Sequence, residues 1–340
     1  MTILIFLFFL GILIFFHELG HFWAARKVGL KVEEFALGFP PRIFRKRISD
    51  TVYSIGIILF GGFVKLKGED NPQDEEGFWA LKPNKRLFVI LSGVLFNIFL
   101  AYFLVSFSLL VGYPTEGNDI FVSGFLNEDS VASKNLKIGD KILYFKIKDE
   151  IFKFDDIRSL SKFLKENKGK EVEIFFEREN KINSFKAILP AGFYISSLSF
   201  KKVAFPSNFY FGIFETLNLF TKFLKGFFMI FRDLLFLKKP DLEVVGPVGI
   251  YNLFDNFKQL GLGYLLYFVA ILSLNLAIIN AFPFPALDGG RALFTLLEYL
   301  KIKKIDYVRE ELIHKIGFVI LFILLFLITI RDISKILWSK

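Results

Sequence analysis

The chain contains no cysteine. It therefore forms no disulfide, offers no thiolate to a metal ion and has no cysteine nucleophile. Histidine is also scarce, with three copies among 340 residues. Any bound metal ion must be held by nitrogen and oxygen donors, because imidazole and carboxylate are the common side-chain ligands that remain.

A basic block is absent as well, although the formal net charge is +9. Lys and Arg are spread among Phe and Ile over the whole length, unlike the clustered charge of nucleic-acid-binding proteins. Hydrophobic residues make up 54% of the chain, and 47 residues are Phe. We expect a polytopic α-helical membrane protein whose positive charge meets the anionic headgroups of a lipid bilayer, and no nucleic-acid partner.

The first segment carries no charged residue from Thr2 to Phe16 and consists almost entirely of Ile, Leu and Phe. This composition predicts a membrane-spanning helix. The alternative is a signal peptide followed by a soluble domain. It is disfavoured because no basic region precedes the apolar run and no clear small-residue cleavage site follows it.

The same helix continues into His17-Glu18-Leu19-Gly20-His21. Ionisable residues in a span cost on the order of 2.5–3.5 kcal/mol each, so they indicate function. Positions four apart lie on one helical face, which lets His17 and His21 direct a ring nitrogen at one ion. Glu18 lies beside that ion and can take a proton from a water molecule there, as in zinc peptidases with an H-E-x-x-H motif.

Three further apolar runs, 87–111, 262–284 and 316–330, bring the number of predicted spans to four. Lys and Arg gather in the segment 26–86 and again after the third span. The positive-inside rule places both of these connections in the cytoplasm. Both termini and the long segment 112–261 then face outward.

An apolar, β-rich stretch from Val52 to Lys67 is interrupted by Gly56, Gly61 and Gly62 and is too short for a helical span. It predicts a glycine-bent strand or hairpin that dips into the membrane face. An exposed edge there can pair with an extended peptide through main-chain hydrogen bonds. The alternative is an interfacial hairpin without a role in substrate binding.

Gly93 and Asn97 share one face of the second predicted span. An amide in hydrocarbon needs a partner, so we expect Asn97 to face the interior of the helix bundle. There it would act as glue between helices rather than in catalysis.

The segment 112–200 changes character, with more charge and short alternating runs, and predicts a β-rich extracytoplasmic domain. The run from Val131 to Leu143 resembles the helix-turn-strand segment of PDZ domains. PDZ domains bind peptides by strand addition. A spacer with a closed groove, or a filter for substrate size, is the alternative. The segment 201–261 follows, and its Phe-rich part 209–237 is too charged for a comfortable span, which predicts amphipathic interfacial helices.

The third span ends in a second unusual stretch, Asn280 to Gly290, which contains Pro283, Pro285 and Asp288. The prolines break the helix and two glycines let the backbone turn, leaving Asp288 on irregular backbone at the membrane edge. Asp288 is the best candidate for a third metal ligand. The alternative is that it only caps the following helix. The third histidine, His314, lies in a charged segment, and we expect it to be a solvated surface residue.

Together these motifs resemble the site-2 protease family of intramembrane zinc metalloproteases, peptidase family M50, in its regulator-of-sigma-E protease branch. The resemblance covers nearly the whole chain. It rests on His17-Glu18-x-x-His21, Gly61-Gly62, Gly93-x-x-x-Asn97, a PDZ-like insert, Gly246-Pro247-Val248-Gly249-Ile250 and Asn280-x-x-Pro283-x-Pro285-x-Leu287-Asp288-Gly289. Longer members carry two PDZ-like domains, whereas this chain has room for one.

The resemblance implies that His17, His21 and Asp288 hold Zn²⁺ and that Glu18 activates water. It further implies that the strand at Gly61-Gly62 receives the unwound substrate, and that Asn280 helps to hold it. The expected enzyme is a zinc endopeptidase of the bacterial inner membrane.

Its expected substrate is a single-span membrane protein, such as an anti-sigma factor or a remnant signal peptide. A metal transporter and a catalytically inert scaffold are the alternatives. A transporter is expected to carry ionisable groups on several helices and a repeat between halves, and neither is visible. The intact Glu18 argues against an inert scaffold.

Overall fold

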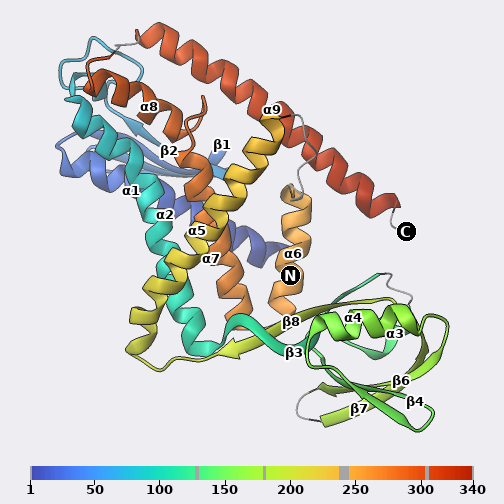
Figure 1. Cartoon of the computed structure of the whole chain (residues 1–340). Coiled ribbons are helices and arrows are strands. Elements are labelled where there is room, and N and C mark those ends of the chain that lie inside the picture. The colour runs from blue at the N-terminus through green and yellow to red at the C-terminus, as the bar shows by residue number, and fades with distance from the viewer. Residues whose placement is uncertain (1, 127–129, 179–180, 237–244, 303–305, 339–340) are drawn as a thin grey trace. The chain divides into compact units, whose positions relative to one another are not determined.

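A computed structural model describes residues 2–126, 130–178, 181–236, 245–302 and 306–338 (Figure 1). The chain divides into two compact units. The first comprises residues 1–104, 212–246 and 269–330, and the second comprises residues 105–211, 247–268 and 331–340.

Four helices in the described part of the chain are long and apolar enough to cross a membrane, judged by length and composition. They are α1 (Thr2–Lys27), α2 (Pro83–Val111), α7 (Leu262–Ala281) and α9 (Tyr307–Trp338). This agrees with the four predicted spans. The helices and the β-rich segment between them are those of a multi-pass membrane protein with an inserted β-rich domain.

The ends of these helices differ from the predicted ones. The second helix begins at Pro83 instead of 87, because proline suits the first helical position. The third ends at Ala281 instead of 284, because Pro283 cannot donate a helical hydrogen bond. The fourth begins at Tyr307 instead of 316, because a polar first turn is helical without being apolar.

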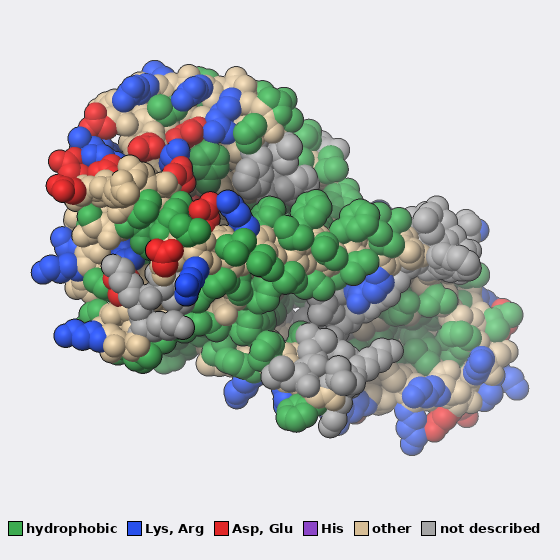
Figure 2. All heavy atoms as spheres, turned by 90° about the horizontal axis from the view of Figure 1, so that it is seen from above, with side chains coloured by type: hydrophobic (Ala, Val, Ile, Leu, Met, Phe, Trp, Pro, Cys, Tyr) green, Lys and Arg blue, Asp and Glu red, His purple; other side chains and the backbone are tan. Residues whose placement is uncertain are grey.

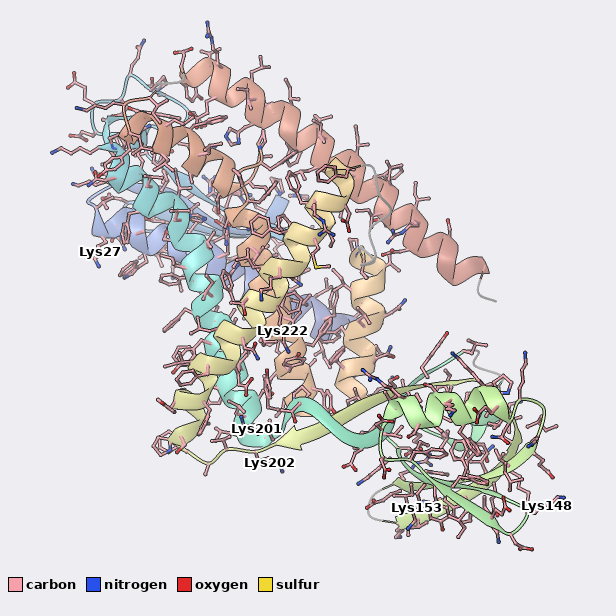
Figure 3. All side chains as sticks on the ribbon, viewed as in Figure 1. Lys27, Lys148, Lys153, Lys201, Lys202 and Lys222 are labelled. Carbon is pink, nitrogen blue, oxygen red and sulfur yellow. The ribbon has the colours of Figure 1, made fainter. Side chains whose placement is uncertain are left out.

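The side chains of α9 are exposed over most of its length. Phe318, Phe322 and Phe326 are each 59–63% exposed, and hydrophobic side chains cover much of the face drawn in Figure 2. At the end of α1, Lys27 Nζ lies 4.6 Å from the centre of the Trp23 ring (Figure 3). Exposed apolar helices that end in Trp and Lys are typical of proteins in contact with a bilayer and its interface.

Strands β1 (Val32–Ile48) and β2 (Thr51–Leu66) form one sheet in the first unit. Each strand is bent, so their halves pair more than once. Residues 42–48 pair antiparallel with 51–56, residues 34–37 pair with 52–55 in the same direction, and residues 32–37 pair antiparallel with 62–66. The half-strand 62–66 is therefore an outer strand of this sheet. The predicted hairpin is present, whereas its position in the membrane face stays a prediction. The sequence did not reveal that the segment from Val32 is its first strand.

Helix α2 packs closely on α1. A Cβ on Gly20 would lie 2.4 Å from the carbonyl oxygen of Ser92, so the two backbones touch. Below this contact, Ala24 and Ala25 are fully buried with Val89 and Ile90 in one apolar cluster. The turn of 3-10 helix at Phe78–Ala80 leads into α2.

The predicted interfacial segment forms two helices, α5 (Ser207–Leu235) and α6 (Pro247–Gln259). Near its end, α5 places Phe227 and Phe231 with ring centres 5.0 and 5.2 Å from that of Phe282. Lys222 lies near the middle of α5 (Figure 3), and its side chain is exposed. The interfacial position of α5 stays a prediction.

The second unit contains a six-stranded sheet in the order β7-β6-β4-β3-β8, with β5 paired to β4. Its strands are β3 (Tyr113–Phe125), β4 (Lys141–Ile147), β5 (Glu150–Lys153), β6 (Glu171–Arg178), β7 (Lys181–Ile188) and β8 (Phe193–Lys201). Helices α3 (Val131–Asn135) and α4 (Ile157–Glu166) complete it.

The core of this β-rich domain is apolar. Val172, Ile174 and Phe176 alternate along β6 and are 3% exposed or less, as the sequence pattern predicts. The run from Val131 forms the predicted helix, turn and strand, α3 followed by β4. The PDZ identity of the domain and its extent of 112–200 stay predictions.

Candidate metal centre

Helix α1 supplies two imidazoles to one point. His17 and His21 are one helical turn apart, and their Nε2 atoms lie 3.3 Å from each other. His17 is buried, with 8% of its surface exposed. The regular helix alone brings these two rings together, which is why the sequence spacing is sufficient to predict their contact.

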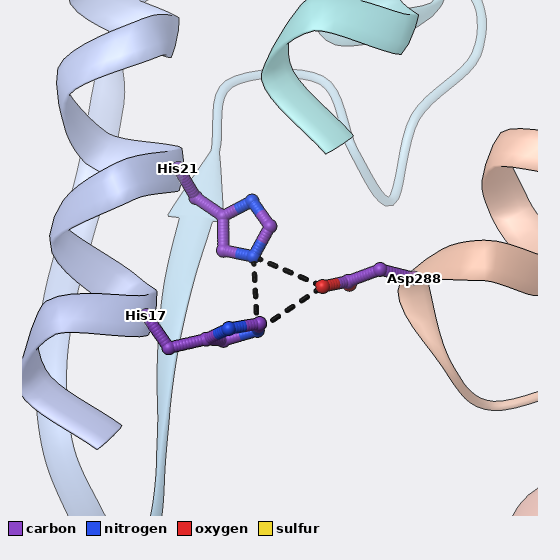
Figure 4. Close-up of side chains that lie close together, drawn as sticks. All are labelled: His17, His21 and Asp288. Atoms are coloured by element: carbon purple, nitrogen blue, oxygen red, sulfur yellow. Dashed lines mark hydrogen bonds and ion pairs between the residues drawn. The ribbon is translucent and has the colours of Figure 1, made fainter. Parts of the chain in front are cut away.

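Asp288 reaches the same point from a distant part of the chain, the first residue of α8 (Asp288–Tyr299). Its Oδ2 atom lies 3.1 Å from His17 Nε2 and 3.3 Å from His21 Nε2 (Figure 4). The residue at the N-cap of α8 is Leu287, and no side chain caps this helix. The alternative reading of Asp288 as a capping residue is therefore wrong.

A tight turn of the backbone between α7 and α8 places Asp288 beside the two imidazoles. A Cβ on Gly289 would lie 2.2 Å from the carbonyl oxygen of Phe282, and one on Gly290 would lie 2.4 Å from that of Phe284. Only glycine allows such contacts, because the backbone folds back onto itself here. The two glycines of the motif therefore have a steric reason to follow Asp288.

The three side chains fit a zinc ion. Their donor atoms are 3.1 to 3.3 Å apart, and two ligand atoms of a tetrahedral zinc site lie roughly 3.3–3.4 Å apart when the bonds are about 2.0–2.1 Å. Asp288 Oδ2 is buried and accepts no hydrogen bond from the described residues. Among those residues, His17, His21 and Asp288 are the one group of three with donor atoms this close.

Helix α2 contacts both imidazoles at their Nδ1 atoms. Val89 O lies 2.9 Å from His21 Nδ1 and can accept its proton, which leaves Nε2 unprotonated. A Cβ on Gly93 would lie 2.4 Å from His21 Nε2, so only glycine fits beside the rings. Asn97 is fully buried, and its carboxamide nitrogen lies 3.2 Å from His17 Nδ1.

The prediction that Asn97 only joins helices to one another is therefore incomplete. Its backbone oxygen does accept a hydrogen bond from Ser273 of α7, which links two helices. Its side chain instead meets His17, and its Oδ1 atom is buried without a partner among the described residues. If the amide is turned by half a rotation, Oδ1 accepts the Nδ1 proton of His17 and leaves Nε2 free for a metal.

Glu18 lies on α1 beside this cluster, with 9% of its surface exposed. Gly62 of the outer half-strand packs directly against it, because a Cβ on Gly62 would lie 2.9 Å from Glu18 Cγ. Gly61 precedes it on β2. Asn280 is also close, with its amide nitrogen 3.5 Å from His17 Nε2. Every site residue predicted from sequence thus lies at or next to one point.

One prediction about the third histidine is wrong. His314 is half-buried, and its Nδ1 accepts a hydrogen bond of 2.9 Å from the backbone N–H of Ala286. Its charged neighbours in sequence predict a surface position instead. The sequence around His314 does not reveal the loop at Ala286 that covers it, because that loop comes from a distant segment.

The sequence also gave no sign of an ion pair next to the site. Glu69, just after β2, pairs with Arg291 in the first turn of α8 at 2.5 Å. A cavity of about 520 Å³ lies beside them and is bordered by Asp288 and His314. The pair connects the end of the outer half-strand to the helix that begins with Asp288.

This arrangement belongs to a broad class of proteins. Two imidazoles one helical turn apart, a carboxylate at the next residue and an oxygen donor from a distant segment form the donor pattern of zinc metallopeptidases. The pattern is formed here by two separate segments of the chain, α1 and the start of α8.

Comparison with known proteins gives the family. The sequence profile of peptidase family M50 matches residues 5–324, and the chain belongs to this family. A protein of Fusobacterium nucleatum assigned as a zinc metalloprotease is 31% identical over 98% of this chain and 99% of its own length. One of Clostridium perfringens with the same assignment is 32% identical over 94% and 95%.

The regulator of sigma-W protease RasP of Bacillus subtilis is 27% identical over 98% of both chains. These matches confirm the resemblance to the site-2 proteases. The chain is a zinc metalloprotease, and zinc is its cofactor.

Proposed function

We propose that this protease cuts a transmembrane helix of a single-span membrane protein, with Zn²⁺ held by His17, His21 and Asp288. The observation that carries the proposal is the convergence of their three donor atoms at distances of 3.1 to 3.3 Å. Three unprotonated donors this close repel one another unless a cation lies between them. When bound, zinc supplies a Lewis acid that activates water near neutral pH.

Glu18 is the general base in this proposal. It takes the proton of the attacking water and then gives it to the amine that leaves when the peptide bond breaks. Its burial beside His17 and His21 fixes the carboxylate at this position. Asn97 and Val89 orient the two imidazoles. Asn280, whose amide nitrogen lies 3.5 Å from His17 Nε2, helps to hold the substrate.

The outer half-strand 62–66 is the proposed substrate site. A helical substrate hides its carbonyls in hydrogen bonds to residues four positions along, so it must unwind before it is cut. Residues 62–66 pair with 32–37 on one side, and within the described residues no strand pairs on the other side. An extended peptide added there replaces its lost main-chain bonds. Gly62 then brings the peptide against Glu18.

We infer substrates of two kinds, an anti-sigma factor or a remnant signal peptide. The name of RasP, a regulator of sigma-W protease, supports the first kind for a relative with 27% identity. The β-rich domain, PDZ-like in its helix, turn and strand, acts as a filter for the size of the substrate's outward part. A transporter or an inert scaffold has no comparable support, since relatives of full length are named as metalloproteases.

The proposed location is the bacterial inner membrane, with both termini outside the cytoplasm. The lack of cysteine makes this easy to test. Asp50→Cys, in the exposed turn between β1 and β2, is expected to resist an impermeant maleimide applied to intact spheroplasts. Lys168→Cys, exposed after α4, is expected to react. Reaction of the first variant and protection of the second would reverse the proposed orientation.

Cleavage itself is tested with purified protein in detergent and a single-span helix with a minimal outward part. Wild-type protein is expected to cut within the helix. Glu18→Gln is expected to lose roughly 10²- to 10⁴-fold in rate while it keeps about one zinc per chain. The matched control is Glu33→Gln, at an exposed position of β1. Residual cleavage by Glu18→Gln within tenfold of the control would rule out Glu18 as the base.

A further inference from the structure

The loop between α7 and α8 depends on α9 for its shape. The loop contains Pro283 and Pro285, which make no backbone N–H bond, and Ala286 with a φ of 76°. A side chain with a Cβ is unfavourable in this left-handed region, because Cβ comes too close to the following carbonyl oxygen. Something outside the loop must therefore hold Ala286, which lies two residues before Asp288.

His314 of α9 provides that hold. Its Nδ1 atom accepts the hydrogen bond from Ala286 N at 2.9 Å, so the ring proton of the neutral side chain is on Nε2. The ring stands edge-on to Phe294 of α8, with the centres 5.8 Å apart and the planes at 87°. His314 thus touches the loop that carries Asp288 and also the helix that Asp288 begins.

Gly317, one helical turn further along α9, lies against the same loop. A Cβ there would be 2.4 Å from Pro285 Cβ and 2.6 Å from Pro285 O. The backbone of α9 is therefore in contact with the loop, and the absence of a side chain is what permits it. Two independent contacts, one polar and one steric, join α9 to the residues just before Asp288.

We propose that His314 is a positioning residue for Asp288. Together with Gly317 it forms a seat on α9, the loop seat, which fixes Pro285 and Ala286 and thereby the direction from which Asp288 enters the metal centre. The donor atoms converge within 3.1 to 3.3 Å, and outer partners of metal ligands are worth about 10- to 100-fold in metal affinity. This inference rests on the proposed role of Asp288 and adds a residue that is not one of the three proposed ligands.

The test measures zinc affinity, by competition with a chelator, in full-length protein that carries Glu18→Gln so that no turnover is involved. His314→Ala is expected to weaken zinc binding by about tenfold or more. His314→Asn is expected to restore it, because the Asn side-chain oxygen is two bonds from Cβ, as Nδ1 is, and can accept the Ala286 N–H. Lys315→Ala, at an exposed neighbouring position paired with Glu311, is the control and is expected to bind zinc normally.

Gly317→Ala provides a second arm that leaves His314 unchanged. It is expected to weaken zinc binding through the steric contact with Pro285, with little change in the melting temperature of the metal-free protein. If His314 has only a structural role, His314→Ala lowers that melting temperature and leaves the zinc affinity of the folded fraction unchanged. In that case His314→Asn also fails to restore the melting temperature.

Asp288→Ala keeps the two proposals apart. If Asp288→Ala weakens zinc binding while His314→Ala and Gly317→Ala bind like the control, the loop seat is overturned and the metal centre stands. If Asp288→Ala itself binds zinc normally, the proposed metal centre fails, and the loop seat fails with it.

Discussion

The two units of this protein each place an aspartate among partners, and the partners differ in kind. In the β-rich domain, Asp140 is 3% exposed and accepts hydrogen bonds from Lys137 N at 2.7 Å and from Arg178 Nε at 2.8 Å. Its charge is fully compensated within its own domain. Asp288 faces two imidazole nitrogens instead, and its Oδ2 accepts no hydrogen bond from the described residues.

The two carboxylates differ in the kind of atom that surrounds them. Asp140 meets N–H donors, so its carboxylate is satisfied by hydrogen bonds within the protein. Asp288 meets two imidazole nitrogens, which offer lone pairs when they carry no proton, so in the proposed metal centre a cation joins the three groups. A buried carboxylate oxygen is common to both cases, and the chemistry of the neighbouring atoms differs.

We expect the strongest loss of zinc affinity from a substitution beside the two imidazoles that changes none of the proposed ligands. Gly93→Ala would place a Cβ 2.4 Å from His21 Nε2 and 2.8 Å from His17 Cε1. We expect zinc affinity to fall by at least about 10- to 100-fold, and cleavage to fall with it. Chelator competition on the purified protein measures this. Gly11→Ala is the control, since nothing lies within 4 Å of its added Cβ. An equal loss of zinc affinity in both variants would show that the steric contact at Gly93 is not the cause.

The second test separates the β-rich domain from the chemistry. Tyr113–Thr115 of β3 pair with Ser199–Lys201 of β8, so these residues can be kept while 119–195 are replaced by a short Gly/Ser linker. The shortened enzyme is expected to cut a minimal substrate normally, and also a substrate with a bulky outward domain, which the intact enzyme leaves uncut. Both substrates are compared by gel assay. Loss of cleavage of the minimal substrate by folded, zinc-loaded protein would indicate a domain that must bind substrate.

A smaller effect is expected for Asp140. Asp140→Asn removes the charge that Arg178 meets, and hydrogen bonds to charged groups contribute about 1.5–3 kcal/mol. Faster hydrogen exchange in β4 and β6 is the expected result, with unchanged zinc content. If zinc were lost as well, the two aspartates would not be independent. Lys146→Gln, on the same strand, is the control for a charge change without the buried pair.

The smallest effect concerns a third aspartate, Asp156, which caps α4. The backbone N–H of Ser159 holds the pKa of this carboxyl below its ordinary value. The ionised carboxylate stabilises α4 at pH values above the unfolded pKa of about 3.9. This contribution is lost as the pH falls through the lower pKa of the folded state. Hydrogen exchange in α4, corrected for intrinsic rates, is expected to rise on acidification. In Asp156→Ala this pH dependence disappears, and if it persisted another group would be responsible.

Much of the candidate site was predictable because it depends on local regularity. His17, Glu18 and His21 follow from helical spacing alone, and Asp288 stands out because prolines and glycines surround it. Gly62 was predicted to lie on a strand, and its contact with Glu18 became visible only with the sheet in place. The roles of these residues as ligands, base and substrate contacts stay predictions.

The features that sequence reasoning missed depend on contacts between distant segments. The strand from Val32 is charged and contains Pro40 and Pro41, which normally argue against a strand, yet β2 pairs with both of its halves. His314 is surrounded by charge in sequence, and the loop that covers it arrives from residue 286. Asn97 lies four residues after Gly93 on the same helical face. That spacing was a usable signal, but the sequence does not identify His17 as its partner.

In the proposed metal centre, Asp288 completes a zinc site with His17 and His21, and the zinc content of three variants tests this. Zinc is counted per chain by mass spectrometry after dialysis against a weak chelator, in wild-type protein, Glu18→Gln and Asp288→Ala. We predict about one zinc in the first two and a clear loss in the third, because removal of one of three protein ligands leaves the two imidazoles alone. Full zinc retention in Asp288→Ala, with unchanged affinity, would contradict the account.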